Sequence, residues 1–190
     1  MVQKIKEVPY GVSDFQTMVE QNIYYVDKTM YIPELEKQAR YLIFIRPRRF
    51  GKSIFLGMLH AYYDCRTKHK FQQWFGDLWI GKHPTPLQGR YQMMHLDFSQ
   101  VGGNIDNLEE KFNFYMGVQL DGFVRDYAEY YSDELRQKVN ATQDAGGKLA
   151  LIQNEAKVKE YPLYLIIDEY DNFTNTVLNE QGEKVYWAMT

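Results

Sequence analysis

The sequence has 190 residues, of which 45% are hydrophobic and 25% charged, and these fractions are ordinary for a soluble globular protein. The formal net charge of -3 excludes binding to nucleic acid through overall positive charge, although a local basic patch can still do so. Cys65 is the single cysteine, which excludes an intramolecular disulfide. Neither the apolar region of a secretory signal nor a run of membrane-spanning length is present, so we expect a soluble, cytoplasmic protein.

The first forty residues are predicted to form short helical and extended pieces. Ser13 is a candidate helix N-cap, and Gln16 follows at the spacing of a capping box. Residues 24–26 form a short extended piece, and a second helix is expected from Pro33 to Ala39. We expect residues 1–40 to pack on a core domain formed by residues 41–190.

The rest of the chain alternates between apolar runs and helical patterns. Three mainly apolar runs are each predicted to be a strand buried on both faces of a parallel sheet: Tyr41–Ile45, Met93–Phe98 and Tyr161–Ile167. Helices are predicted between them, over residues 54–62, 68–79 and 108–131. Gly146 and Gly147 are expected to interrupt the helical pattern before the last run. This alternation predicts an α/β fold with a mainly parallel sheet.

The loop after the first run, residues 46–53, is typical of a phosphate-binding loop. Such a loop needs inward-pointing backbone N–H groups, a helix N-terminus, a lysine and a hydroxyl, which the Walker A pattern G-x-x-x-x-G-K-[ST] provides between a strand and a helix. Gly51, Lys52 and Ser53 fill the last three positions. Gly51 lets the backbone approach the phosphates, Lys52 would reach the β- and γ-phosphates, and Ser53 would bind Mg²⁺.

Arg46 stands where this pattern has its first glycine, and Pro47 can compensate by fixing one φ angle. Arg48 and Arg49 either touch phosphate, contact a partner surface or form a solvated basic turn. The alternative without a function is that Gly-Lys-Ser is a chance tripeptide beside a solvated basic turn. The predicted strand before it and the predicted helix after it favour phosphate binding. The residues expected to contact nucleotide here are Arg48, Arg49, Phe50, Gly51, Lys52, Ser53 and Ile54.

The third apolar run ends in acids, as a Walker B strand does. Asp168 is placed to hold Mg²⁺, and Glu169 is placed to polarise the attacking water if it points at the γ-phosphate. Taken alone, the segment can equally be an ordinary buried strand that runs into an acidic turn. Its combination with the loop at Gly51 favours an ATP site in which Lys52 and Glu169 are the catalytic residues.

Six segments, in order, resemble the bacterial AAA-ATPase-like family and together cover nearly the whole chain. They are Tyr10–Phe15, Tyr24–Thr29, Phe44–Ser53, Phe75–Gly81, His95–Ser99 and Asp168–Asp171. The loop of this family commonly begins with Arg-Pro-Arg-Arg, so Arg46 is similar to the family pattern and does not indicate a decayed site.

The resemblance implies a three-layer α/β/α P-loop fold of the additional-strand, catalytic-glutamate class, with ATP and Mg²⁺ as ligands. It also implies Lys52 and Ser53 as phosphate and Mg²⁺ contacts, Asp168 as the Mg²⁺ acid and Glu169 as the water activator. Longer members of the family continue into a nuclease-like domain of the restriction-endonuclease type, which implies nucleic acid as a partner of the longer protein. That domain is not present in this sequence.

Two residues have roles that the sequence leaves open. Tyr25 either stacks on adenine, as the corresponding region does in related ATPases, or is a core tyrosine beside a structural pair formed by Asp27 and Lys28. Asp97 lies at the end of the second run, at the sheet edge where ligands gather in parallel sheets, and it either joins the Mg²⁺ shell or caps a turn.

The additional-strand class requires one more strand, which follows the acidic strand in sequence and lies between it and the loop strand. Only loop and helix patterns follow Asp168, so we expect a truncated piece of a longer protein with a gap in its sheet.

The leading hypothesis is a Mg²⁺-dependent ATPase domain. The alternative is a non-hydrolysing module whose basic loop contacts nucleic acid or an acidic protein surface. A GTPase is disfavoured because no Asn-Lys-x-Asp pattern is present.

Overall fold

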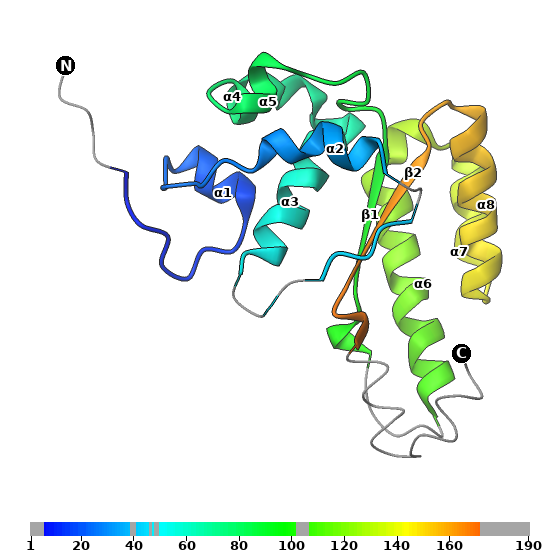
Figure 1. Ribbon diagram of the computed structural model, residues 1–190. Helices are drawn as coiled ribbons and strands as arrows, with labels where there is room; N and C mark the ends of the chain where they lie inside the picture. Colours follow the sequence, from blue (N-terminus) through cyan, green and yellow to red (C-terminus); the bar gives the residue numbers. More distant parts are fainter. Residues whose placement is uncertain (1–5, 39–40, 46, 48–49, 102–106, 172–190) are drawn as a thin grey trace. The chain divides into compact units, whose positions relative to one another are not determined.

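The computed structural model describes residues 6–38, 41–45, 47, 50–101 and 107–171 (Figure 1). The chain divides into two compact units, one that ends at Tyr91 and one that begins at Gln92, and each is described by itself. Helices dominate both units, and the described strands belong to the second. None of the described helices combines the length and the apolar composition that crossing a membrane requires.

The first unit is built from short helices around one longer helix. Its elements are α1 (Phe15–Glu20), η1 (Thr29–Tyr31), α2 (Ile32–Glu36), α3 (Lys52–Tyr63), η2 (Cys65–Lys70), α4 (Phe71–Phe75) and α5 (Trp79–Lys82). The N-cap of α1 is Asp14, whose Oδ2 accepts the Thr17 backbone N–H at 2.7 Å. The prediction of Ser13 as the cap is therefore wrong by one residue, because the Asp14 carboxylate reaches the third amide of the helix.

An aromatic core holds α3 against α1 and α4. Phe15 of α1, Tyr62 of α3 and Phe75 of α4 are all buried. The rings of Phe15 and Phe75 stack with their centroids 5.1 Å apart, and Tyr62 meets Phe75 edge-on at 5.5 Å. Burial of each such side chain contributes about 1.5–3 kcal/mol, so this cluster fixes the helix that begins directly after the predicted phosphate-binding loop.

Asp27 and Thr29 join the segment before this loop to the N-terminus of α5. The Asp27 Oδ1 accepts the backbone N–H and the hydroxyl of Thr29, while its Oδ2 accepts the Trp79 N–H at 2.7 Å. The Thr29 hydroxyl oxygen accepts the Ile80 N–H at 3.1 Å. These bonds satisfy amides that the first turn of a helix leaves unpaired, so residues 27–29 are held in place on both sides of Lys28.

The second unit places a two-stranded parallel sheet beside three helices. Its elements are β1 (Gln92–Asp97), η3 (Phe98–Gln100), α6 (Leu108–Asp126), η5 (Ala128–Tyr130), α7 (Asp133–Ala141), α8 (Ala145–Val158) and β2 (Leu163–Asp168). The strand register runs from Gln92 opposite Leu163 to Asp97 opposite Asp168. The predicted strands at 93–98 and 161–167 and the helical region at 108–131 are confirmed.

The glycine pair before β2 does not break a helix. Gly146 and Gly147 lie in the first turn of α8, and the Asp144 side chain accepts the Gly147 N–H at 2.5 Å. The prediction of an interruption there is wrong because a capped first turn tolerates glycine, whose cost is felt mainly inside a helix. Further along α8, Lys148 is buried and donates to both carboxylate oxygens of Asp121 on α6, at 2.6 and 2.7 Å.

Tyrosine hydroxyls from the helical layer contact backbone groups of β1. The Met93 N–H donates to the Tyr127 hydroxyl at 2.7 Å, and the Asp97 N–H donates to the Tyr115 hydroxyl at 2.9 Å. Strand β1 therefore uses both neighbours, β2 and the tyrosines, to satisfy its backbone. On β2, Leu165 and Ile167 are exposed although every residue of the strand before Asp168 is apolar or aromatic.

The first apolar run does not form a buried strand in this structure. Residues 41–45 have no assigned strand, and Tyr41, Ile43 and Ile45 are each about four-fifths exposed, at 83%, 79% and 81%. An apolar run becomes a strand only when a neighbour pairs with its backbone, and the described sheet contains β1 and β2 alone. The observed architecture is thus mixed α/β, mostly helical, with a small parallel sheet. The segment predicted to follow the acidic strand lies outside the described residues.

Candidate functional site

Gly51 forms the turn from the predicted loop into α3. Its φ of 76° and ψ of 27° lie in the left-handed region, where a glycine avoids the strain that a side chain would bring. It is the N-cap of α3, and Lys52 is the first residue of the helix. Ser53 follows and is exposed. The first amides of α3 and the positive end of its dipole thus lie beside Lys52, an arrangement that favours an anion.

The residues around this turn are partly described. The Phe50 N–H donates to the Pro47 carbonyl at 3.3 Å, which closes a turn just before Gly51. Phe44, before the loop, stacks on Phe55 of α3 with ring centroids 5.0 Å apart. The predicted nucleotide contacts Arg48 and Arg49, as well as Arg46, lie outside the described residues.

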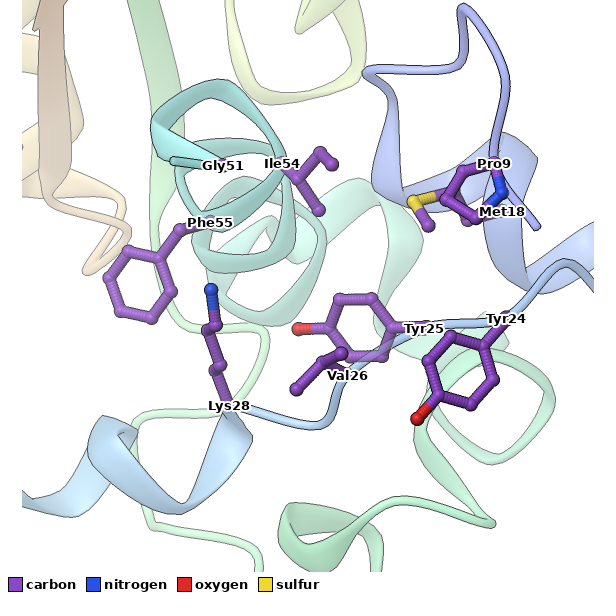
Figure 2. Close-up of a pocket in the computed structure, with 9 residues that line it drawn as sticks. All are labelled: Pro9, Met18, Tyr24, Tyr25, Val26, Lys28, Gly51, Ile54 and Phe55. Atoms are coloured by element: carbon purple, nitrogen blue, oxygen red, sulfur yellow. The ribbon is translucent and has the colours of Figure 1, made fainter. Parts of the chain in front are cut away.

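A cavity of about 160 Å³ opens beside the N-terminus of α3 (Figure 2). Its walls come from Tyr24, Tyr25, Val26 and Lys28 on one side and from Gly51, Ile54 and Phe55 on the other, with Pro9 and Met18 completing the lining. Engineered protein cavities of about 150 Å³ accommodate a benzene ring, so this cavity has room for one aromatic ring of a ligand. The cavity brings three predicted contacts, Tyr25, Gly51 and Ile54, to one place.

Tyr25 combines features of both roles that the sequence left open. Its ring packs edge-on against the core residue Phe15, with centroids 5.1 Å apart, and the same side chain lines the cavity. Its hydroxyl oxygen is buried and makes no hydrogen bond of ordinary geometry with the described residues. Burial and then the Asp27 charge raise the pKa of Tyr25, and the nearby Lys28 amide offsets part of this shift. The hydroxyl therefore stays neutral and can donate to a ligand.

Lys28 is the residue that the sequence prediction missed. Its ammonium nitrogen lies 3.7 Å from the position that a Cβ on Gly51 would occupy. The structural pair between Asp27 and Lys28, one of the two alternatives that the sequence left open, is not observed, because the Asp27 carboxylate is engaged by Thr29 and Trp79. Only a partial signal was present in the sequence: Asp and Thr are residue types that cap helices, but the helix that they cap lies far along the chain.

The predicted acidic site is at the carboxyl end of β2. Asp168 is the last residue of the strand and is 8% exposed, and its Oδ1 accepts the Glu169 N–H at 2.9 Å. Glu169 has a φ of 52°, in the left-handed region that costs a non-glycine residue roughly 1–2 kcal/mol. Strained residues of this kind cluster at functional sites, so the conformation of Glu169 marks it as a candidate.

Asp97 and Asp168 end the two strands in register, so their side chains leave the same face of the sheet. The Asp97 Oδ1 accepts the Ser99 N–H at 2.9 Å, which confirms the predicted turn-capping role of Asp97. Two carboxylates on adjacent strands repel each other unless a cation or proton lies between them. Across the described part of the chain, no group of three or more His, Cys, Asp or Glu side chains is arranged as a metal site.

Comparison of the chain with known protein families gives a match to a family model described as a predicted AAA-ATPase, over residues 9–190. An uncharacterized protein in the vnfD 5′ region of Azotobacter chroococcum mcd 1 is 44% identical over 55 residues, which amount to 28% of this chain and 11% of that protein. The chain thus matches only a small part of the length of this relative. No solved structure matches the chain significantly.

Proposed function

Because the chain belongs to the family of predicted AAA-ATPases, we propose that it binds ATP together with Mg²⁺ and hydrolyses it. The observation that carries this proposal is the left-handed Gly51 at the N-cap of α3, followed at once by Lys52 and Ser53. A glycine turn, a helix N-terminus, a lysine and a hydroxyl are the parts that a Walker A loop needs to hold phosphate.

In this proposal the first unit binds the nucleotide. Lys52 contacts the β- and γ-phosphates, and the backbone N–H groups at the start of α3 donate hydrogen bonds to the phosphate oxygens. Arg48, Arg49 and Phe50 complete the loop around the phosphates, as the sequence predicts. The base enters the cavity lined by Tyr25 and Ile54, where its apolar walls and the buried Tyr25 hydroxyl receive it.

Mg²⁺ binding is assigned to Ser53 and Asp168, and water activation to Glu169, which follows the last residue of β2. Mg²⁺ is held in proteins through hydroxyl and carboxylate oxygens, with one or two carboxylates plus substrate phosphates, so the donor set of Ser53 and Asp168 fits this ion. Asp97, which lies opposite Asp168 in the strand register, can add a second carboxylate. Glu169 polarises the attacking water, because a carboxylate within reach of a water is a general base.

We also propose a three-layer α/β/α fold of the additional-strand class for this chain. Such a fold requires more parallel strands than β1 and β2. The apolar run at 41–45 and the exposed Leu165 and Ile167 of β2 support it, because exposed apolar side chains on strand-like segments indicate surfaces made for further packing.

Calorimetric titration of the protein with ATP in the presence of Mg²⁺ tests the proposal. Wild type is expected to bind, and Lys52→Ala is expected to weaken binding roughly ten- to a hundredfold, because a hydrogen bond to a charged group contributes about 1.5–3 kcal/mol. Lys82→Ala, at the exposed end of α5, is the control and should bind as wild type does.

A different result would favour the non-hydrolysing module. In that case ATP would not bind, and the protein would instead bind DNA or RNA in a salt-sensitive manner that Arg48→Ala and Arg49→Ala weaken. Absence of ATP binding by wild type, or equal binding by Lys52→Ala, would overturn the proposal.

A further inference from the structure

We infer that Lys28 is a second phosphate-binding cation, supplied from outside the Walker A loop, that contacts the nucleotide where the cavity meets the N-terminus of α3. The inference rests on the proposed function, because it names a further residue of the same nucleotide site. Figure 2 shows the Lys28 side chain extending from its own segment toward Gly51, on the side of the cavity that the Tyr25 hydroxyl also faces.

The position of Lys28 is fixed by its neighbours. Asp27 and Thr29 are both hydrogen-bonded to the first amides of α5, at 2.7 and 3.1 Å. The Lys28 carbonyl accepts the Tyr31 N–H at 3.2 Å, as the first bond of η1. With the backbone held on both sides, the lysine side chain is directed to Gly51, and its ammonium nitrogen lies 3.7 Å from the position of a Cβ on that glycine.

The charges around Lys28 make this position unfavourable without a ligand. The N-terminus of a helix carries a partial positive charge, and Lys52 is the first residue of α3. None of the ion pairs found among the described residues involves Lys28, and the carboxylate next to it, Asp27, is turned to α5. A lysine ammonium held near the positive N-terminal end of a helix is stabilised when an anion binds between the two.

The surroundings of Lys28 identify the anion as part of a nucleotide. The cavity that it lines is otherwise bounded mainly by apolar and aromatic side chains, among them Tyr25 and Ile54. An anion bound by Lys28 therefore has an apolar, ring-sized space on one side and the phosphate-binding turn at Gly51 on the other. A nucleoside phosphate fits both surroundings, because its base is planar and apolar on its faces and its phosphates are anionic.

The test measures ATP affinity for Lys28→Gln, Lys28→Arg and the control Lys82→Gln. The account predicts that Lys28→Gln weakens ATP and ADP binding roughly ten- to a hundredfold, while Lys28→Arg stays within a few fold of wild type because it keeps the charge. The control should be unchanged. Thermal unfolding without nucleotide should show Lys28→Gln to be at least as stable as wild type, since it removes a cation from a positive environment.

Three outcomes would overturn the inference. The first is an affinity of Lys28→Gln within twofold of wild type, and the second is binding by Lys28→Arg that is as weak as that by Lys28→Gln. The third is unfolding of the free Lys28→Gln protein at a clearly lower temperature than wild type, which would indicate a packing role. If wild type binds ATP and Lys52→Ala weakens that binding while Lys28→Gln does not, only this inference fails. If Lys52→Ala has no effect either, the proposed function fails with it.

Discussion

Gly51 and Glu169 both adopt a left-handed backbone, with φ of 76° and 52°, but only Glu169 carries a side chain in this conformation. At Gly51 a side chain is absent, so the backbone turns into α3 without strain and leaves room for a ligand. At Glu169 a side chain is retained despite a cost of roughly 1–2 kcal/mol. The comparison teaches that a left-handed residue without a side chain shapes a backbone turn in the first unit, whereas the one in the second unit keeps a carboxylate despite the cost.

If this difference is functional, substitutions in the two units should have separable effects. Changes around Gly51 should act on nucleotide affinity, and changes at Glu169 should act on the hydrolytic step. The predictions below are ordered from the largest expected effect to the smallest.

The largest effect is expected for Glu169→Gln. Removal of a general base typically lowers a rate by about 10²–10⁴-fold, so the kcat for ATP hydrolysis should fall by that factor. The rate of phosphate release at saturating ATP measures it. Glu160→Gln is the matched control, because Glu160 also has a left-handed backbone, with a φ of 58°, and lies in the same unit. A similar loss of kcat in both variants would argue against a special role for Glu169.

The second prediction concerns how firmly α3 is held at its other end. Asp64 follows α3 and is 1% exposed. Burial alone would raise the pKa of Asp64, but hydrogen bonds from His60 and Arg66 outweigh burial and lower it from 3.8 to about 2. The shift corresponds to about 2 kcal/mol of folding stability that is present above pH 4 and is lost as the pH falls toward 2.

Asp64→Asn should therefore lower the free energy of unfolding by about 2 kcal/mol at neutral pH. The difference from wild type should narrow between pH 4 and pH 2, as the wild-type carboxylate takes up a proton. Urea unfolding at several pH values measures this, with Asp77→Asn, in an exposed turn, as the control. A constant difference across this range would contradict the assigned ionisation.

The smallest effect on stability is expected for Gly51→Ala. An alanine at this φ should cost about 1 kcal/mol of folding stability, although its Cβ would meet Lys28 Nζ at an ordinary 3.7 Å. Gly11→Ala is the control, because Gly11 has a φ of 70° with open space around it. Both variants should be destabilised to a similar extent in thermal unfolding, but only Gly51→Ala should also weaken ATP binding. Equal ATP affinity in both would contradict a ligand role for the turn at Gly51.

Local sequence signals predicted local structure well. Helix α3, which begins at Lys52, was predicted from Ile54 onward by its helical periodicity, and both strands of the sheet follow from mainly apolar runs. The acids at the end of β2 were placed correctly for the same reason. The resemblance to a family was confirmed by the match over residues 9–190.

Features that depend on distant partners were not predictable. The runs at 41–45 and 161–167 look alike in sequence, yet only the second forms a strand, because pairing with β1 decides the outcome. A pair between Asp27 and Lys28 was one of two alternatives for this segment, and Asp27 instead caps α5, far along the chain. The position of Lys28 beside Gly51 follows from that long-range cap, which no local pattern contains.

The central claim is that nucleotide binding resides in the first unit and hydrolysis requires the acids of the second. The most direct test is to measure the dissociation constant for Mg²⁺-ATP and the kcat on the same preparations of Lys52→Ala and Glu169→Gln. The account predicts that Lys52→Ala loses affinity, whereas Glu169→Gln keeps wild-type affinity and loses turnover. Equal loss of affinity in both variants, or unchanged turnover in Glu169→Gln, would contradict it.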